Sequence, residues 1–193
     1  MRALVPAAMV FALSCGPSSP GAQAPGSSVV AKNVATSEGV TISAACTPTG
    51  PELCFNANDD NCNGLIDEGC GVYTGVLQFI IAWGDSAADV DISVVDPSGA
   101  KVHKGNPSIA SGLRLERSCP DEDCHHQSVE NVFFDGSEPA KGRYVVEVKL
   151  VDPHGVDLPV KVHFSVRIGS RTYAMDLALS PGPGEKQTFA FEL

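Results

Sequence analysis

The sequence is poor in basic residues, and this shortage narrows the range of partners. It carries 13 lysine and arginine residues against 23 aspartate and glutamate residues, so its formal net charge is −10. Binding to nucleic acid needs a basic face that displaces counterions from the phosphates. We therefore expect no nucleic-acid partner, whereas the clustering of carboxylates favours divalent cations.

Signatures of common enzyme classes are also absent from the sequence. The chain has no nucleophile elbow, no zinc-protease helix motif and no phosphate-binding loop. It also has no sustained helical hydrophobic period on which such motifs usually stand. We therefore expect no catalytic residues and a protein that is not an enzyme, with a small hydrolase as the least favoured alternative.

The apolar run near the N-terminus, residues 3–13, is too short to span a bilayer. Arg2 precedes it and small residues follow, which is the layout of a secretory signal. The end of the run reads ALSCG at residues 12–16 and resembles a bacterial lipoprotein signal peptide. This resemblance implies that Cys15 is lipidated and anchors the protein to a membrane. Gly16 after the cysteine implies the outer membrane or the cell surface, and ordinary secretion is the alternative.

The cysteines independently indicate export. Of the seven cysteines, lipidation of Cys15 leaves an even number, which favours disulfide bonds in an oxidising compartment. Many pairings are open to them, and the sequence does not choose one. For Cys119 and Cys124 we expect a bridge to each other, with a zinc site that includes the adjacent histidines as the alternative. The disulfide candidates are Cys46, Cys54, Cys62, Cys70, Cys119 and Cys124.

Composition divides the chain into four parts. Residues 1–15 are expected to be the signal peptide with the lipidation cysteine. Residues 16–45 are expected to form a flexible tether and a lead-in, since their first half is rich in proline, glycine and serine. A cysteine-rich segment follows at residues 46–71, and residues 72–193 form a β domain.

The cysteine-rich segment contains a loop that matches most positions of an EF-hand. Counted from Asp59 as position 1, side chains that carry oxygen fall at positions 1, 3, 5 and 9, and Gly64 stands where the chain must turn sharply. Position 12 is Cys70, so Glu68 is expected to replace the usual glutamate in part. Asp60 at position 2 is expected to point outward. The expected calcium ligands are Asp59, Asn61, Asn63, the carbonyl of Leu65, Asp67 and Glu68.

Other interpretations of this loop remain open. Its asparagine and aspartate side chains could cap their own backbone in a turn that disulfides hold closed. A zinc or copper site made from the same cysteines is less favoured, because disulfide bonding removes the thiolates that these metals need. Residues 51–71 also resemble the MopE-type metal-binding motif of secreted bacterial proteins, and this resemblance implies a metal-binding segment without a reaction.

After residue 71, apolar and polar residues alternate with the period of β-strands, so that each strand has one apolar face. Gly169-Ser170 is a two-residue hairpin signal, and the DPSG sequence at residues 96–99 predicts a turn. Strands of this kind predict a mostly β fold, an antiparallel β-sandwich preceded by the small disulfide-rich, EF-hand-like calcium loop segment. On one long strand, Lys161, His163, Ser165 and Arg167 are expected to face outward. The expected inward faces are Leu77, Phe79, Ile81 and Trp83; Val90, Ile92 and Val94; Tyr144, Val146, Val148 and Leu150; Val160, Val162, Phe164, Val166 and Ile168; Tyr173, Met175, Leu177 and Leu179; and Phe189, Phe191 and Leu193.

A second cation site is considered at the strand that follows the only tryptophan. Asp89 and Asp91 lie two residues apart on one strand face, near Asp85, and together could chelate a cation. Alternatively, they bond to a neighbouring loop or face water.

The span of residues 75–193 resembles the YfaP-like family of secreted bacterial β-sandwich domains. The resemblance rests on Trp83, on ADVDI at residues 88–92, and on DPSG at residues 96–99. Further matches are VENV at 129–132, GRYVVEV at 142–148 and PGEKQTF at 183–189. It implies a fold and export rather than a function.

These features favour a lipid-anchored surface module that calcium stabilises and that binds a glycan, a peptide or a partner protein. The alternative is a structural or assembly protein of the cell envelope, in which calcium only rigidifies the stalk. An exposed aromatic or polar patch would favour the binding module, whereas a long unpaired edge strand would favour assembly.

Replacing Cys15 by serine should move the protein from the membrane fraction to the soluble fraction. The bacterial modification attaches several acyl chains, and each buried methylene adds about 0.8 kcal/mol of membrane affinity. Cell fractionation followed by mass determination of the N-terminus measures this. A wild-type protein that is soluble with a free amino terminus would exclude the anchor.

Overall fold

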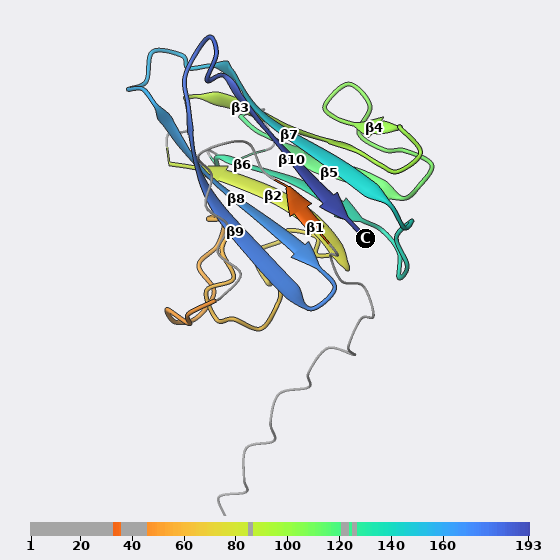
Figure 1. Cartoon of the computed structure of the whole chain (residues 1–193). Coiled ribbons are helices and arrows are strands. Elements are labelled where there is room, and N and C mark those ends of the chain that lie inside the picture. Colours follow the sequence, from red (N-terminus) through yellow and green to blue (C-terminus); the bar gives the residue numbers. More distant parts are fainter. Residues whose placement is uncertain (1–32, 36–45, 85–86, 121–123, 125–126) are drawn as a thin grey trace, which may run out of the picture.

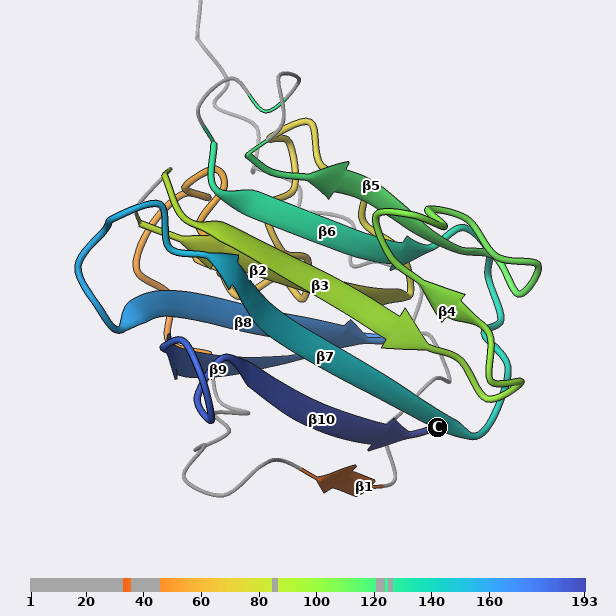
Figure 2. The ribbon, with the colours of Figure 1, turned by 90° about the horizontal axis from the view of Figure 1, so that it is seen from above.

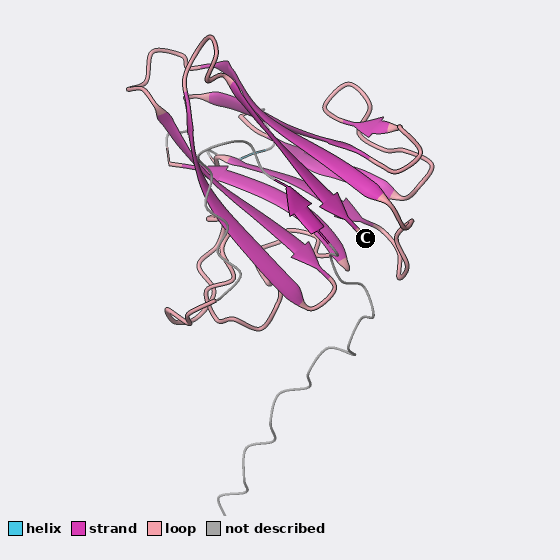
Figure 3. Cartoon of the chain, viewed as in Figure 1, coloured by secondary structure: helices cyan, strands magenta, loops and turns pink. Residues whose placement is uncertain are grey.

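The described part of the chain consists almost entirely of β-strands and loops (Figure 3). The structure is a computed structural model, and it describes residues 33–35, 46–84, 87–120, 124 and 127–193. Cys15, the predicted signal peptide and Asp85 therefore lie outside the described residues. The strands are β1 (Asn33–Ala35), β2 (Leu77–Trp83), β3 (Asp89–Val95), β4 (Lys101–Val102), β5 (Leu113–Ser118), β6 (Val129–Phe134), β7 (Arg143–Asp152), β8 (Val160–Ile168), β9 (Arg171–Leu179) and β10 (Lys186–Glu192).

The strands form two antiparallel sheets that face each other (Figures 1 and 2). The strand order is β1-β10-β7-β3-β4 in one sheet and β5-β6-β2-β8-β9 in the other. We refer to them as the β3 sheet and the β2 sheet. The mostly β, antiparallel fold predicted from the alternation is confirmed.

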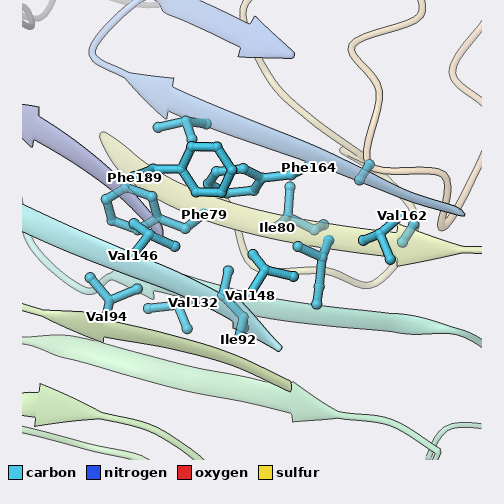
Figure 4. Close-up of a cluster of buried hydrophobic side chains, with 14 of the residues drawn as sticks. Phe79, Ile80, Ile92, Val94, Val132, Val146, Val148, Val162, Phe164 and Phe189 are labelled. Atoms are coloured by element: carbon cyan, nitrogen blue, oxygen red, sulfur yellow. The ribbon is translucent and has the colours of Figure 1, made fainter. Parts of the chain in front are cut away.

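Aromatic side chains join the two sheets from within (Figure 4). The ring centroids of Phe164 and Phe189 are 4.8 Å apart, and those of Phe79 and Phe191 are 5.8 Å apart. In each pair one ring comes from the β2 sheet and the other from β10. Such tilted contacts add about 0.5–1.5 kcal/mol each to the stability gained from burial. All of the side chains predicted to face inward are buried.

β2 is buried on both of its faces, which the alternation did not predict. Ile80 and Ala82, on the face opposite Phe79, are as inaccessible to solvent as the inner core. Ser165 and Arg167 of β8 were expected to face outward in solvent, and they are buried instead. The reason is that the cysteine-rich segment covers this outer face of the β2 sheet, below β8 and β9 in Figure 1.

The predicted turns are present, and their hydrogen bonds explain their sequences. At the DPSG turn, the Gly99 N–H donates to the Asp96 carbonyl at 2.9 Å. The Asp96 carboxylate accepts hydrogen bonds from the N–H groups of Ser98 at 2.9 Å and Ala100 at 3.0 Å. Gly99 has a φ of +87°, a conformation that glycine adopts without steric cost.

The lead-in contributes a strand that the sequence did not indicate. β1 pairs antiparallel with β10 at the edge of the β3 sheet. In the part of the chain that is described, no helix is long and apolar enough to cross a membrane.

Replacing Ile66 by alanine should destabilise the whole protein, because Ile66 is fully buried in the hydrophobic cluster that the cysteine-rich segment shares with the strands. Loss of a buried isoleucine side chain to alanine costs about 2–5 kcal/mol. The control is Leu53→Ala in the same segment, where 61 % of the residue is exposed, and it should change stability by less than about 0.5 kcal/mol. Chemical unfolding of the oxidised protein measures both, and equal midpoints for the two variants would show that the segment does not pack on the sheet.

Candidate metal site

Two disulfide bonds hold the cysteine-rich segment in shape. Cys46 is bonded to Cys62 and Cys54 to Cys70, each across a sequence separation of 16. Sequence analysis had left this pairing open. The predicted bridge between Cys119 and Cys124 is confirmed. Disulfide bonds of this kind indicate an extracellular or envelope location.

Asp59 lies at the start of the predicted calcium loop and organises the backbone of the loop. Its carboxylate accepts hydrogen bonds from the N–H groups of Asn63 and Gly64, both at 3.0 Å. Gly64 has a φ of +84°, so the sharp turn expected at this glycine is present. Burial raises the pKa of Asp59, and the nearby charge of Glu68 adds to this effect, while the hydrogen bonds oppose it.

Asn61, Asn63 and Glu68 converge over the loop. The Oδ1 atoms of the two asparagines accept backbone N–H groups at 3.0 Å and 2.8 Å. Their Nδ2 atoms both donate to Oε1 of Glu68 at 2.6 Å. The other oxygen of Glu68, Oε2, is buried and has no hydrogen-bond partner in the described part of the chain. Glu68 therefore lies beside positions 3 and 5, although its sequence position is not that of an EF-hand ligand.

Glu52 reaches the loop from outside, and sequence reasoning missed it. Its Oε1 atom accepts the Asp67 N–H at 2.8 Å, whereas its Oε2 atom is buried with no hydrogen-bond partner among the described residues. Burial raises the pKa of Glu52 to about 7, and the charges of Glu68 and Asp60 add to the shift. Because Glu52 precedes position 1 of the loop, EF-hand spacing does not predict its contact with the loop.

Asp67, predicted as the ligand at position 9, is bound by the backbone. It is fully buried, and its carboxylate accepts the N–H groups of Asn56 at 3.3 Å and Ala57 at 3.0 Å. Burial raises its pKa, and these hydrogen bonds oppose the increase. Asp67 thus ties the loop to the preceding turn, and its role as a metal ligand stays a prediction.

Asp60 was expected to point outward from position 2, and this expectation is wrong. It is 3 % exposed, and its carboxylate accepts hydrogen bonds from the Thr49 hydroxyl, the Leu53 N–H and the Asn56 side chain. Burial alone would raise the pKa of Asp60, but these hydrogen bonds outweigh it and lower the pKa. The cause is the chain before the loop, which folds over position 2 and has no counterpart in EF-hand numbering.

The loop is attached directly to the hairpin of β8 and β9. The Thr172 hydroxyl donates to the Asp59 carboxylate at 3.3 Å. Gly64 lies so close to the hairpin turn that an added Cβ atom would be 3.1 Å from the Ser170 carbonyl oxygen. The Arg167 guanidinium also interacts electrostatically with Asp59 and donates to the Gly75 carbonyl. Position 1 of the loop is therefore also part of the interface with the β2 sheet.

The donor set suits a hard cation that accepts neutral oxygens. Within the described residues, no three or more histidine, cysteine, aspartate or glutamate side chains are grouped so that they could hold a metal ion by themselves. The loop instead places the side-chain amides of Asn61 and Asn63 beside the carboxylate of Glu68, their Nδ2 atoms donating to it and their Oδ1 atoms accepting backbone N–H groups. Calcium takes amide and main-chain carbonyl oxygens as ligands, whereas zinc prefers thiolates and imidazoles. The cysteines here are in disulfide bonds, so the residues present fit calcium better.

The second cation site considered at Asp85, Asp89 and Asp91 stays a prediction. Asp89 and Asp91 are partly exposed on β3. Their charges act on Glu130 of β6, which is 1 % exposed and accepts the Ile92 N–H at 2.6 Å. Burial raises the pKa of Glu130 well above its ordinary value, and Asp91 and Asp89 add to this, against the hydrogen bonds from Ile92 and Ser118. No pattern in the sequence had singled out Glu130.

A groove of about 660 Å³ separates part of the cysteine-rich segment from the strands. Phe55 lines one side, and Trp83, His163 and Asp176 line the other. Nδ1 of His163 is 2.8 Å from the Asp176 carboxylate, and Nε2 of His163 has no hydrogen-bond partner in the described part of the chain. A histidine–carboxylate pair takes part in catalysis when its other nitrogen faces a nucleophile or a substrate proton, and the geometry of the described residues identifies neither. The expectation that the protein is not an enzyme stays a prediction.

Replacing Glu130 by glutamine should make stability less dependent on pH. Because the folded-state pKa of Glu130 lies above its ordinary value of 4.5, its stabilising contribution is complete below that value and is lost as pH rises through the folded-state pKa. Glutamine resembles the protonated acid, so the variant should melt at a higher temperature than the wild type at alkaline pH. Thermal unfolding over a pH series, with the exposed Glu138→Gln as control, measures this, and parallel curves for wild type and Glu130→Gln would contradict it.

Comparison of the chain with protein-family models, curated proteins and solved structures found no match.

Proposed function

We propose that this chain is an exported module of the cell envelope that binds calcium through the 59–68 loop and binds a further ligand at its surface. The observation that carries the calcium site is the convergence of Asn61, Asn63 and Glu68, with Glu52 beside them. Glu52 and Glu68 each keep one buried carboxylate oxygen without a hydrogen-bond donor. Native proteins rarely leave such oxygens unsatisfied, and a bound cation supplies the missing partner.

The proposed ligands are Asp59, Asn61, Asn63, the Leu65 carbonyl, Asp67 and Glu68, with Glu52 as an additional carboxylate. Asp67 also holds the preceding turn in place. Two asparagines in place of aspartates lower the ligand charge, and this favours the affinity of extracellular calcium modules, about 10⁻⁴ to 10⁻³ M.

A contact between the loop and β9 supports the proposed calcium site. Because Asp59 also accepts a hydrogen bond from Thr172 of β9, an ion at the loop would fix the loop and its contact with the strands at the same time. The disulfides support an exported location. The lipoprotein-type signal, the MopE-type motif and the YfaP-like span agree with an envelope module, and the lipid anchor at Cys15 is part of this proposal.

Assembly of the envelope is the alternative, and β9 is the feature that bears on it. β9 lies at the edge of the β2 sheet and pairs with β8. However, the exposed Arg171 and Asp176 place charges on this edge strand, and such charges discourage pairing with another chain. We therefore favour the binding module over the assembly protein.

Calcium should bind the oxidised, metal-stripped protein at submillimolar to millimolar concentration and raise its melting temperature. At a hundredfold excess over the dissociation constant the gain should approach about 2.7 kcal/mol. Magnesium should do much less, because it gives up its water reluctantly. Calorimetric titration and thermal unfolding measure both effects.

The variants Glu68→Gln and Asp59→Ala should remove most of the calcium response. Glu68→Gln keeps the side-chain shape and removes only the charge, so it separates ligand loss from misfolding. The control Asp157→Asn removes a carboxylate at an exposed position elsewhere and should respond like the wild type. No calcium binding at millimolar concentration, or an Asp59→Ala variant that binds as well as the wild type, would refute the site.

A further inference from the structure

The most exposed aromatic side chain in the described part of the protein is held in a fixed position. Tyr73 is 66 % exposed, yet its ring stacks on Phe133 with the centroids 5.3 Å apart and the ring planes at 19°. Its backbone N–H donates to the Glu116 carboxylate at 2.9 Å, and its carbonyl accepts from the Asn131 amide at 2.9 Å. An aromatic ring that is both exposed and fixed loses little conformational entropy when a ligand covers it.

The fixed position of Tyr73 originates in the β2 sheet. Asn131 also donates to Glu116 at 2.8 Å and accepts from Gln78 of β2 at 3.1 Å. Gln78 and Asn131 are fully buried. Buried polar residues in a connected network specify one arrangement of their neighbours. The network therefore determines the position of the Tyr73 backbone.

A hollow of about 570 Å³ lies beside this ring, and several of its lining residues come from β5 and β6. These two strands form one edge of the β2 sheet (Figure 2). Tyr73 and Phe133 form its aromatic wall. Its polar rim includes Arg114 and Asp135, which form an ion pair at 3.0 Å while each side chain is more than half exposed. The volume is within the range of small-molecule sites, about 300–1,000 Å³.

We propose that this hollow binds a neutral carbohydrate chain, with a pyranose ring stacked on Tyr73 and its hydroxyls bonded to Arg114 and Asp135. The C–H groups on one face of a pyranose are apolar and pack on an aromatic ring, while its hydroxyls both donate and accept. The rim offers both functions, because a guanidinium donates and a carboxylate accepts. The positive charge of Arg114 is already paired with Asp135, and the chain carries a net charge of −10. This charge balance favours a neutral sugar over an acidic one.

This inference rests on the proposed function, since it names the ligand class of the surface module. It assigns the hollow at Tyr73 to that ligand, whereas the calcium loop lies against β8 and β9 at the other edge of the same sheet. The two sites therefore have separate residues and can be tested separately.

The test is binding of the oxidised protein, with calcium present, to a panel of soluble oligosaccharides. The panel holds neutral hexose chains, acidic uronate chains and a proline-rich peptide, which aromatic grooves also recognise. We expect binding to neutral chains, measured by calorimetry. Tyr73→Ala should weaken it by roughly tenfold, the energy of an aromatic contact, while Tyr73→Phe should stay near the wild-type affinity. Arg114→Ala should also weaken binding.

The matched control is Leu158→Ala, which removes an apolar side chain that is 51 % exposed outside the hollow. It should bind as the wild type does, and unchanged melting temperatures would show that Tyr73→Ala remains folded. No binding to neutral chains, binding only to uronates or to the peptide, or wild-type affinity in Tyr73→Ala would each overturn the inference. A wild-type protein that responds to calcium but binds no sugar would refute the carbohydrate site alone. A wild-type protein that binds sugar but shows no response to calcium would refute the calcium site alone.

Discussion

β2 places apolar side chains on the outer face of its sheet as well as on the inner face, and much of the structure depends on how they are covered. Ile80 and Ala82 of β2 carry apolar area on the outer face, and each Å² removed from water is worth about 25 cal/mol. The cysteine-rich segment supplies the cover but contributes few core residues, chiefly Ala57 and Ile66. So small a segment needs its two disulfides to limit its unfolded states. We therefore expect the segment and the sheet to stabilise each other.

Covering this face also buries polar groups, and their partners connect the sheet to the loop. Arg167 loses hydration under the segment, and burial lowers its pKa while Asp59 opposes that shift. A buried guanidinium is tolerated only when it is hydrogen-bonded and faces negative charge. The Gly75 carbonyl and Asp59 meet part of these needs, while the Nε atom of Arg167 is buried with no hydrogen-bond partner among the described residues. Asp59 therefore belongs to the interface with the sheet as well as to the loop, because its carboxylate also interacts with Arg167 of β8.

The strands could be predicted because each has one face that must be apolar, and the inward series of β7 and β10 needed nothing beyond a period of two. β2 shows the limit of that reasoning, since its second face is buried by a segment from elsewhere in the chain. The same limit applies to the candidate site. EF-hand spacing predicted the sharp turn that contains Asp59, Asn61 and Asn63, because their hydrogen bonds involve the backbone of the loop itself, and their role as ligands stays a prediction. It misplaced Asp60 and missed Glu52, since both depend on how residues 46–56 fold back onto the loop.

The two proposed sites lie at opposite edges of one sheet face, and the chain that connects them is short. The proposed calcium loop ends at Glu68, and Tyr73 lies five residues later in the chain. Arg117 of β5 donates to the Gly71 carbonyl at 3.3 Å, so the connection is held to the sheet between the two. The buried Gln78 and Asn131, together with the half-buried Glu116, then fix Tyr73 independently of the loop. An ion at the loop would stabilise the cover of the sheet without being needed to orient the aromatic ring, because the sheet itself supplies that orientation.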